Sequence, residues 1–553
     1  MAGHKGFRNL PKLERLKRGR PAPSPPPVAR GAGRPPRRSR SESPSHLVSL
    51  SDFPPGRQTV LRTLADLLGP PHPALSPWGG EDEGEGAFIV GGAVRDLLLS
   101  RGVMEDLDLA LPSGALALAR ELASRLGGTF VLLDEGRGAA RVIVKDETGA
   151  RQVDLTDFRA STLEADLRGR DFSVNAIALP LGPLVRQGKA RLVDPTGGMR
   201  DLARRRLRLA GAAAFEEDPL RALRGVRLAI ELGFVLDSEA KRASRAVAPR
   251  LAAIPPERIR EEVVRLLSLP RASRGLRELD RLGLLEAIVP EIGPMKSANQ
   301  PKPHRFSVWE HSLKTVEAVE LLLERLSSLT PYADELAEHV AEPLGDGLTR
   351  RESLKLAALF HDVAKPQTRR VIEGQVRFIG HDVEGAATVR ALGQRLRLSG
   401  KAVDVLERLV RHHLRPMHLG QVAPLTRRAR YRFFRDLGAE ARDLLLLTLA
   451  DAAAVRGDSP LDIWRGPAGR LVSDLLGGWE EDRLQTAASP LVRGEDVMAA
   501  FGISPGPEVG RLLALAREAQ DLGVVRTREE ALAYLRRASD APDGGLDTRK
   551  APD

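Results

Sequence analysis

The chain has 553 residues, no cysteine and a formal net charge of +11. This length favours several domains over a single core, and the absence of cysteine excludes disulfide partners, thiolate nucleophiles and Cys-ligated metal sites. Positive charge favours a polyanionic partner, although basic proteins without one are common. No apolar run is long enough for a membrane helix, and residues 1–40 lack the apolar centre of a secretory signal, so we expect a cytoplasmic protein without membrane contact.

Residues 1–54 are rich in Pro, Arg and Gly and contain little that could form a core, which predicts a disordered basic arm. Such an arm could attract phosphates or act as a solubilising leader, and its Arg-rich composition is also typical of organelle transit peptides. The folded body is predicted to begin near Arg57, where QTVLRTLADLL has helical spacing. The acidic segment EDEGEGA separates this helix from the first motif.

The stretch GAFIVGGAVRDLLL predicts a strand, a glycine turn and a helix. Gly91 and Gly92 allow backbone amides to approach a ligand closely, and the start of the following helix favours phosphate oxygens. We expect these amides and Arg95 to hold a triphosphate. Adjacent glycines are also common in ordinary turns, so this motif alone is weak.

Two carboxylates follow in EDLDLAL, where strand alternation places Asp106 and Asp108 on one face. A lone Asp-x-Asp is usually a solvated strand face, but behind this glycine turn it can hold two Mg²⁺ ions for nucleotidyl transfer. Asp154, in RQVDLTDFR, could add a third carboxylate from a neighbouring strand or be an edge residue.

Four motifs in order, within residues 86–236, resemble the class II tRNA nucleotidyltransferase and bacterial poly(A) polymerase family: FIVGGAVRDLLL with EDLDLAL, EADLRGRDFSVNAIAL, DPTGGMRDL and FEEDPLRALRGVRLAIELGF. The resemblance implies a Mg²⁺-dependent enzyme that adds C and/or A from CTP and ATP to the 3′ end of tRNA without a template. A poly(A) polymerase shares these head motifs and is the alternative. The implied fold is α+β, with a small mixed-sheet head followed by an all-α neck, a helical HD domain and a helical C-terminal module.

The later motifs also make chemical sense by themselves. Arg170 can meet triphosphate oxygens, and Asp171 can accept a ribose hydroxyl. Family members usually have Arg-Arg-Asp here, whereas Gly169 occupies the first Arg position.

Helical spacing aligns a charged row in EDPLRALRGVR, which is often only a solvated face. An Asp acceptor beside an Arg donor matches the Watson–Crick edges of cytosine and adenine, whereas uracil presents the reverse order. The resemblance assigns this base-reading role to Asp218 and Arg221, with Arg224 and Arg227 supporting the site and the phosphates.

The identity of the added nucleotides depends on a loop. Members that build a complete CCA end usually carry a longer polar loop before the DFSVNA-type motif, whereas here DFR reaches EADLRGRDF through only ASTL. A short loop resembles members that add only CC, or specialised adenylators.

A second constellation begins near Lys302 and resembles the HD phosphohydrolase superfamily: VWEHSL, AALFHDVAKP, FIGHDVEGA, LVRHHLRP and TLADA. The resemblance implies a first metal held by His311, His361, Asp362 and Asp451, and a second metal or phosphate held by His381 and one of His412 or His413. Imidazole and carboxylate ligands suit Ni²⁺, Co²⁺, Mn²⁺ or Mg²⁺, and a bound water would attack a phosphoester. A vestigial site is the alternative for this domain, and an HD phosphohydrolase with a non-catalytic head is the more remote alternative for the whole chain.

These motifs divide the chain into consecutive parts. We expect the following order: arm 1–54, nucleotidyltransferase head 55–188, nucleotide-selecting and RNA-binding neck 189–295, HD domain 296–456, helical body 457–538 and disordered tail 539–553.

Overall fold

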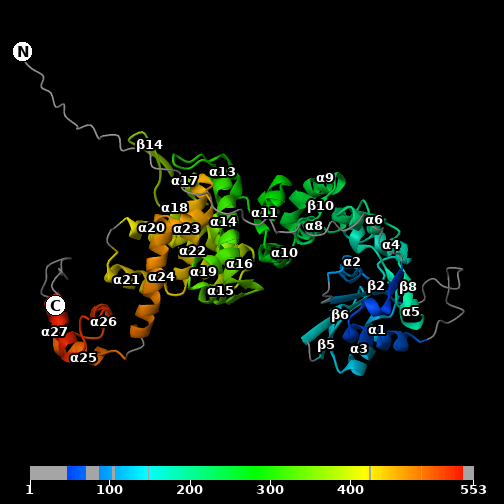
Figure 1. Ribbon diagram of the computed structural model, residues 1–553, viewed down its shortest axis with the longest axis horizontal. Coiled ribbons are helices and arrows are strands. Elements are labelled where there is room, and N and C mark those ends of the chain that lie inside the picture. The colour runs from blue at the N-terminus through cyan, green and yellow to red at the C-terminus, as the bar shows by residue number, and fades with distance from the viewer. Residues whose placement is uncertain are drawn as a thin grey trace, which may run out of the picture. The chain divides into compact units, whose positions relative to one another are not determined.

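The computed structural model describes residues 47–69, 86–101, 106–146, 149–421, 425–486 and 489–539 (Figure 1). Residues 1–46 of the predicted arm, 540–553 of the predicted tail and most of the acidic segment EDEGEGA lie outside these ranges. The last part of the arm was wrongly predicted to be disordered. Strand β1 (Leu47–Ser49) pairs with β8 (Lys189–Arg191), and Phe53 is buried in the core, so these apolar residues anchor the chain to the head.

The head contains a six-stranded sheet of order β4-β5-β6-β3-β2-β7. Strands β3 and β6 are parallel and the other neighbours are antiparallel, so the sheet is mixed as predicted. The strands are β2 (Phe88–Val90), β3 (Asp106–Leu111), β4 (Thr129–Asp134), β5 (Ala139–Asp146), β6 (Gly149–Asp157) and β7 (Leu179–Pro180). The head helices are α1 (Pro55–Leu68), α2 (Gly92–Leu98), α3 (Ala115–Leu126), α4 (Leu163–Arg168), α5 (Leu181–Arg186) and α6 (Gly198–Ala203).

Alternation along β3 and β6 divides the two faces of the sheet. Leu107 and Leu109 of β3 and Val153 and Leu155 of β6 are fully buried in the main apolar core. The intervening residues of β3 therefore face the other side, where the carboxylates lie.

The neck is helical apart from the short parallel pair β9 (Arg206–Leu207) and β10 (Val235–Leu236). Helix α8 packs against α10 and α11. The neck helices are α7 (Ala214–Glu217), α8 (Leu220–Leu232), α9 (Ser238–Val247), α10 (Pro256–Ser268), α11 (Ala272–Arg281), α12 (Leu284–Ile288) and α13 (Ile292–Ser297).

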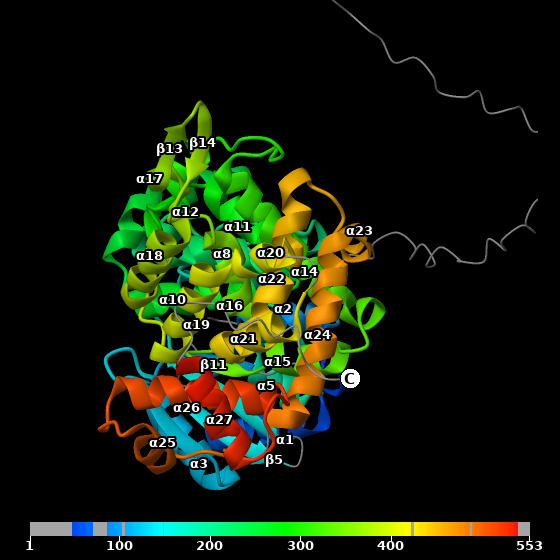
Figure 2. The same ribbon diagram turned by 90° about the vertical axis from the view of Figure 1, so that its left-hand side faces the viewer.

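The HD domain is built around α14, which packs against both α16 and α22, while α18 packs against α19. Its helices are α14 (Val308–Leu329), α15 (Ala333–Val340), α16 (Arg350–Phe360), α17 (Lys365–Thr368), α18 (His381–Arg395), α19 (Gly400–His412), α20 (Arg415–Gly420), α21 (Arg427–Leu437) and α22 (Glu440–Arg456). Its strands form two small hairpins, β11 (Pro343–Gly345) with β12 (Leu348–Thr349) and β13 (Arg369–Ile372) with β14 (Gln375–Phe378). The second hairpin projects from the helices of the domain (Figure 2).

The C-terminal module has a separate apolar cluster that includes Val497, Leu512 and Leu535. Helix α26 meets α21 through Glu518, which accepts from Arg428 and Arg435. The last helices are α23 (Pro460–Arg465), α24 (Pro467–Thr486), α25 (Gly494–Phe501), α26 (Pro507–Asp521) and α27 (Arg528–Ser539). In the described ranges, every helix is too short or too polar to cross a lipid bilayer.

Candidate active sites

Three head carboxylates lie together at neighbouring positions of two parallel strands. The register places Asp108 of β3 directly opposite Asp154 of β6, and Asp106 opposite Gln152. Since β6 lies between β5 and β3, Asp154 belongs to an interior strand, and the edge-residue alternative is wrong. Asp154 accepts two hydrogen bonds from Arg141, both of 2.8 Å.

The electrostatics of Asp108 reflect this crowding. Burial raises the pKa of the Asp108 carboxyl, and the neighbouring Asp154 raises it further, whereas Arg170 and Arg224 oppose the shift. Asp106, at the start of the same strand, is exposed. A pair of carboxylates whose mutual repulsion is only partly compensated is suited to divalent cations.

The backbone of Gly91 lies close to the carboxylate of Asp108. Its φ is +73°, in the left-handed region, and a Cβ added there would lie 2.6 Å from Oδ2 of Asp108. Any other residue would both strain the backbone and displace the carboxylate. Helix α2 begins at Gly92, one residue before the AVRDLLL segment that was predicted to be helical.

Arg95 was predicted to contact a triphosphate, but protein encloses most of its side chain. Its side chain is buried, Nη1 donates to Oδ1 of Asn175 at 2.8 Å, and Nε and Nη2 donate to Asp96. These contacts connect α2 to the segment that follows Asp171.

Asp171 is buried and holds Arg224. Its Oδ2 lies 3.0 Å from Nε of Arg224, and its Oδ1 accepts from Asn175 and from the Phe172 amide. Burial alone would raise the pKa of Asp171, but Arg224 and these hydrogen bonds hold it below its ordinary value. The predicted ribose contact would therefore compete with this network, while Arg224 remains half exposed beside the site.

The predicted base-reading pair lies at the junction of α7 and α8. Oδ1 of Asp218 accepts from the Leu220 amide at 3.2 Å, and Oδ2 accepts from Nη2 of Arg258 at 2.8 Å. Arg221 donates to the carbonyl of Ala214 at 3.0 Å. Arg258 was not predicted as a site residue, because PERIREE is recognisable in the sequence only as part of a helix.

Arg227 is the buried member of the predicted charged row of Asp218, Arg221, Arg224 and Arg227. It is 9% exposed, its Nε lies 2.7 Å from Glu262 of α10, and its Nη1 lies 2.6 Å from Glu231. Both ends of the guanidinium are occupied, and the contact with Glu262 joins α8 to α10.

Arg159 is a second residue that the sequence analysis missed. Burial lowers its pKa, and the positive charges of Arg170 and Arg221 lower it further. Asp166, whose Oδ2 lies 3.2 Å from Nη2 of Arg170, offsets part of this repulsion, and a bound triphosphate would offset more of it. Its sequence signal is an arginine that closely follows the strand carrying Asp154.

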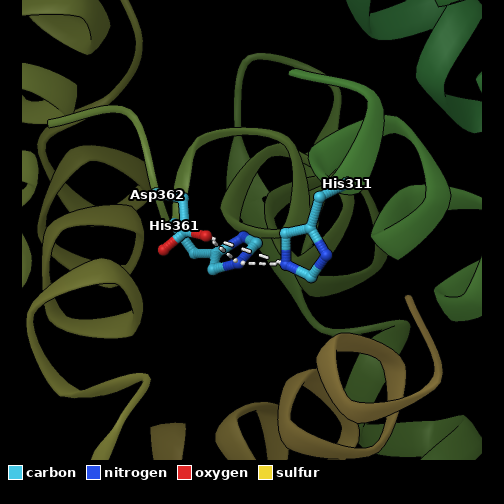
Figure 3. A group of neighbouring side chains, drawn as sticks. All are labelled: His311, His361 and Asp362. Carbon is cyan, nitrogen blue, oxygen red and sulfur yellow. Dashed lines mark hydrogen bonds and ion pairs between the residues drawn. The ribbon is translucent and has the colours of Figure 1, made fainter. Parts of the chain in front are cut away.

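In the HD domain, the predicted ligands meet at the ends of helices (Figure 3). His311 lies in the first turn of α14, and His361 and Asp362 directly follow α16. Nε2 of His311 lies 3.3 Å from Nε2 of His361, and Nε2 of His361 lies 3.2 Å from Oδ2 of Asp362. Asp451 of α22 completes the group, with Oδ1 at 3.0 Å from Nε2 of His311.

A second group shares Asp362. Nε2 of His381 lies 3.5 Å from Oδ1 of Asp362 and 3.3 Å from Nε2 of His413. His413, and not His412, occupies this position, because successive residues at a helix end point about 100° apart. Burial and the positive charges of Arg415, Arg408 and Arg411 lower the pKa of His412, which lies outside the group.

Both groups are buried and rich in donors for a divalent cation. Burial would raise the pKa of Asp362, but His361 and Lys365 hold it well below its ordinary value, so the carboxylate is ionised and ready to bind metal. Two His/Asp triads joined by one carboxylate fit a pair of metal ions.

Lys365 and His304 were missed by the sequence analysis. Nζ of Lys365 lies 2.6 Å from Oδ2 of Asp362 and 2.7 Å from Oε1 of Gln300. The His304 and His311 rings are 5.1 Å apart, and burial together with Lys365 lowers the pKa of His304 to about 4. The Lys365 signal lies in HDVAK, three residues after Asp362.

Three family models match the chain in succession. They are the poly(A) polymerase head domain at residues 87–208, the probable RNA- and SrmB-binding site of polymerase A at residues 233–295, and the HD domain at residues 308–453.

Relatives match nearly from end to end. An A-adding tRNA nucleotidyltransferase of Deinococcus radiodurans is 39% identical over 483 residues, covering 86% of this chain and 99% of that protein. A CC-adding tRNA nucleotidyltransferase of Thermus thermophilus is 39% identical over 459 residues, covering 81% of this chain and 93% of that protein. The solved structure of the Thermotoga maritima CCA-adding enzyme complexed with tRNA shares the fold, with a TM-score of 0.57 at 18% identity over 89% of this chain and 99% of that one.

The sheet, the neck and the HD helices thus follow the order of the three matched models, and the fold is α+β as predicted. The length and identity of the matches to both adding enzymes establish the relationship over the whole described body. This chain is an enzyme of the tRNA nucleotidyltransferase and poly(A) polymerase family.

Proposed function

We propose that this enzyme adds C and/or A nucleotides from CTP and ATP to the 3′ end of tRNA in the cytoplasm. The observation that carries the proposal is the carboxylate face formed by Asp106, Asp108 and Asp154 beside the guanidinium group of Arg159 and Arg170. The names of the relatives, which are A-adding and CC-adding tRNA nucleotidyltransferases, support the tRNA substrate.

The chemistry follows from the placement of charge. Asp106 and Asp108 would hold Mg²⁺, which, when bound, polarises the attacking hydroxyl and neutralises phosphate charge. The RNA 3′ oxygen attacks the α-phosphorus of the nucleotide and loses its proton, and the bond to pyrophosphate breaks. Arg159 and Arg170 would bind the departing phosphates, because guanidinium groups donate two parallel hydrogen bonds to phosphate oxygens.

Base choice would come from the start of α8. Asp218 would accept from the exocyclic amine of cytosine or adenine, and Arg221 would donate to the unprotonated ring nitrogen. Arg258, whose Nη2 lies 2.8 Å from Asp218, would hold the carboxylate in a fixed orientation.

The choice between C and A requires a direct assay, since the A-adding and CC-adding relatives are equally similar at 39% identity. Three tRNAs, ending before CCA, after C and after CC, would each be incubated with CTP, ATP or both. A CC-adding enzyme extends only the first two with CTP, an A-adding enzyme extends only the third with ATP, and a complete CCA-adding enzyme extends all three. A long adenosine tail on any RNA would instead support a poly(A) polymerase, and no extension would refute the proposal.

A second activity is favoured by the HD domain. Two buried His/Asp triads share Asp362, which is the arrangement expected for activating water against a phosphoester. We propose hydrolysis of a 2′,3′-cyclic phosphate, or of a 2′- or 3′-phosphate, that blocks the RNA end. Water oxygen bonds to phosphorus, one ester P–O bond breaks, and the proton of the attacking water passes to the leaving ribose oxygen. Where that oxygen is O3′, the step frees the hydroxyl that the head extends.

The metals of the two sites should differ. The head offers carboxylate oxygens and suits Mg²⁺, whereas the imidazole-rich HD group favours Ni²⁺, Co²⁺ or Mn²⁺. Wild-type protein that hydrolyses neither cyclic nucleotides nor phosphomonoesters with any of these metals would refute the second activity.

A further inference from the structure

The hairpin β13–β14 is inserted between the two halves of the HD site. Lys365, which contacts Asp362, begins the four-residue helix that leads into β13, and His381 follows β14. The carbonyl of Phe378 lies 2.6 Å from Nδ1 of His381, and Nζ of Lys365 lies 5.5 Å from the centre of the Phe378 ring. The base of the hairpin therefore forms part of the wall of the site.

Beyond its base, the hairpin leaves the packed helices (Figure 2). All four residues of β13 are exposed. Val371 is 61% exposed, and Ile379, just after β14, is 62% exposed. The turn is tight, because Glu373 and Gly374 both have positive φ, at 51° and 75°. An isolated two-stranded hairpin is only marginally stable, and exposed apolar side chains add no burial. Packing within the chain therefore does not explain why this hairpin projects.

Charge on the hairpin points to an anionic partner. Arg370 lies directly opposite Arg377 in the register, and Ile372 lies on the same face by alternation. Like charges directly opposed across two strands are destabilising. Within the described part of the chain, Arg369, Arg370 and Arg377 make no ion pair with a carboxylate, and the one side-chain acceptor found for them is Gln375, which lies 3.4 Å from Nη2 of Arg377.

We propose that the β13–β14 hairpin binds the single-stranded 3′ segment of an RNA whose terminal phosphate enters the HD site. Arg370 and Arg377 match phosphate oxygens, their planes can stack on unpaired bases, and Ile372 adds apolar contact on the same face. The position of the hairpin base against Lys365 and His381 brings this bound segment to the reacting group. This inference rests on the proposed hydrolase activity of the HD domain, and it makes RNA, rather than a free nucleotide, the preferred substrate.

The first test separates RNA binding from hydrolysis by comparing two substrates. The double variant Arg370→Gln/Arg377→Gln would be assayed with Ni²⁺ or Mn²⁺ on an oligoribonucleotide ending in a 2′,3′-cyclic phosphate and on 2′,3′-cyclic CMP. We expect kcat/KM for the oligonucleotide to fall about tenfold, chiefly through KM, because two phosphate contacts are lost. The rate on cyclic CMP should stay within about twofold. Equal rates of wild type and variant on the oligonucleotide, or an equal loss on both substrates, would overturn the inference.

The matched control is Arg325→Gln/Arg351→Gln, which removes the same charge from the same domain. Arg325 lies 14 residues after His311 along α14, and Arg351 lies 10 residues before His361, at the far end of α16. At a helical rise of 1.5 Å per residue, each is about 15 Å or more from the ligand at the other end of its own helix. This control should leave both substrates unaffected. Thermal unfolding of both double variants should match that of wild type, since none of the four side chains is buried.

A second measurement does not need hydrolysis. Ile372→p-benzoylphenylalanine and Arg325→p-benzoylphenylalanine would be irradiated with an end-labelled oligoribonucleotide that carries a 3′-phosphate, in wild-type and Asp362→Ala backgrounds. We expect a crosslink near the RNA 3′ end from position 372 in both backgrounds and none from position 325. If wild type hydrolyses nothing, the proposed HD activity has failed while the crosslink still decides whether the hairpin binds RNA. If cyclic CMP is hydrolysed and position 372 gives no crosslink, the hairpin inference alone has failed.

Discussion

In the head, Asp106 and Asp108 project from a single strand, and Asp106 is exposed. Most of the HD ligands instead lie at the ends of several helices, and all of them except Asp451, which lies within α22, are buried. A strand fixes the spacing of its own carboxylates, so the head site requires few long-range contacts to assemble. The HD site forms only when five helices pack together: α14, α16, α18, α19 and α22. The head site therefore remains accessible to a substrate that brings its own phosphates, whereas protein surrounds the charges of the HD site.

The largest effect should come from the open site. Asp106→Ala or Asp108→Ala should lower nucleotide incorporation about a thousandfold or more, because metal positioning contributes several kcal/mol to the transition state. RNA binding, measured by filter retention, should remain within a few-fold of wild type. Asp66→Ala, which removes an exposed head carboxylate from α1, is the control and should behave as wild type. Substantial incorporation by both active-site variants would contradict the assignment.

Loss of the buried site should leave the head intact. Asp362→Ala removes the carboxylate that both His triads share, so hydrolysis of cyclic nucleotides and bound transition metal, measured by mass spectrometry, should fall to background. Incorporation into a tRNA with a free hydroxyl should be unchanged.

A second test of the HD site compares the adjacent residues His412 and His413. His413→Ala should reduce metal content, while His412→Ala, outside the group, should not. Equal losses of bound metal in the two variants would contradict the assignment of His413, and not His412, to the metal-binding group.

A smaller effect should follow from the base-reading contacts. Asp218→Ala should weaken discrimination against UTP and GTP about tenfold or more, because the penalty for an unmatched base edge is lost. Arg258→Gln should weaken it less, since Asp218 remains but its orientation is no longer held at 2.8 Å. Arg258→Lys should restore part of the discrimination, and Arg265→Gln, an exposed arginine on the same helix, should have no effect. Competition assays with mixed nucleotides would measure these ratios.

The smallest effect concerns pH. Burial and the Asp154 charge raise the pKa of Asp108, so protonation competes with metal binding as the pH falls, and activity should be lost on the acid side. Asp154→Asn removes the neighbouring negative charge, lowers the pKa of Asp108 and should move the acid limb to lower pH. Arg141 loses its partner in this variant. Arg141→Gln is the comparison, because removal of this positive charge beside Asp108 should move the acid limb the other way, to higher pH. A shift to higher pH in Asp154→Asn would contradict the electrostatic account.

The sequence predicted the parts of these sites that lie within one element. The strand, glycine turn and helix of FIVGGAVRDLLL, and the common face of Asp106 and Asp108, follow from local periodicity and are confirmed by β2, α2 and β3. The mixed α+β architecture is likewise confirmed.

Contacts between distant segments could not be predicted. Arg258 reaches Asp218 across 40 residues, and the choice of His413 over His412 depends on how α19 packs against α18. Neither contact leaves a periodic pattern in the local sequence from which it could be predicted. The ordering of residues 47–54 was missed for the same reason, since β1 is stabilised by β8, which lies more than a hundred residues later in the chain.

Helix α10 also has a practical consequence for dividing the enzyme. On one side it binds the nucleotide-selecting part of the neck around α8, through Arg258–Asp218 and Glu262–Arg227. At its end, Nζ of the buried Lys355 in α16 donates to the carbonyls of Leu267 and Leu269. A head fragment cut before Pro256 would leave Arg227 without Glu262, and one cut after Ser268 would leave the α10 terminus without its cap. The smallest independently expressed catalytic piece should therefore include α16, and proteolysis between α8 and α16 should inactivate the enzyme rather than release a working head.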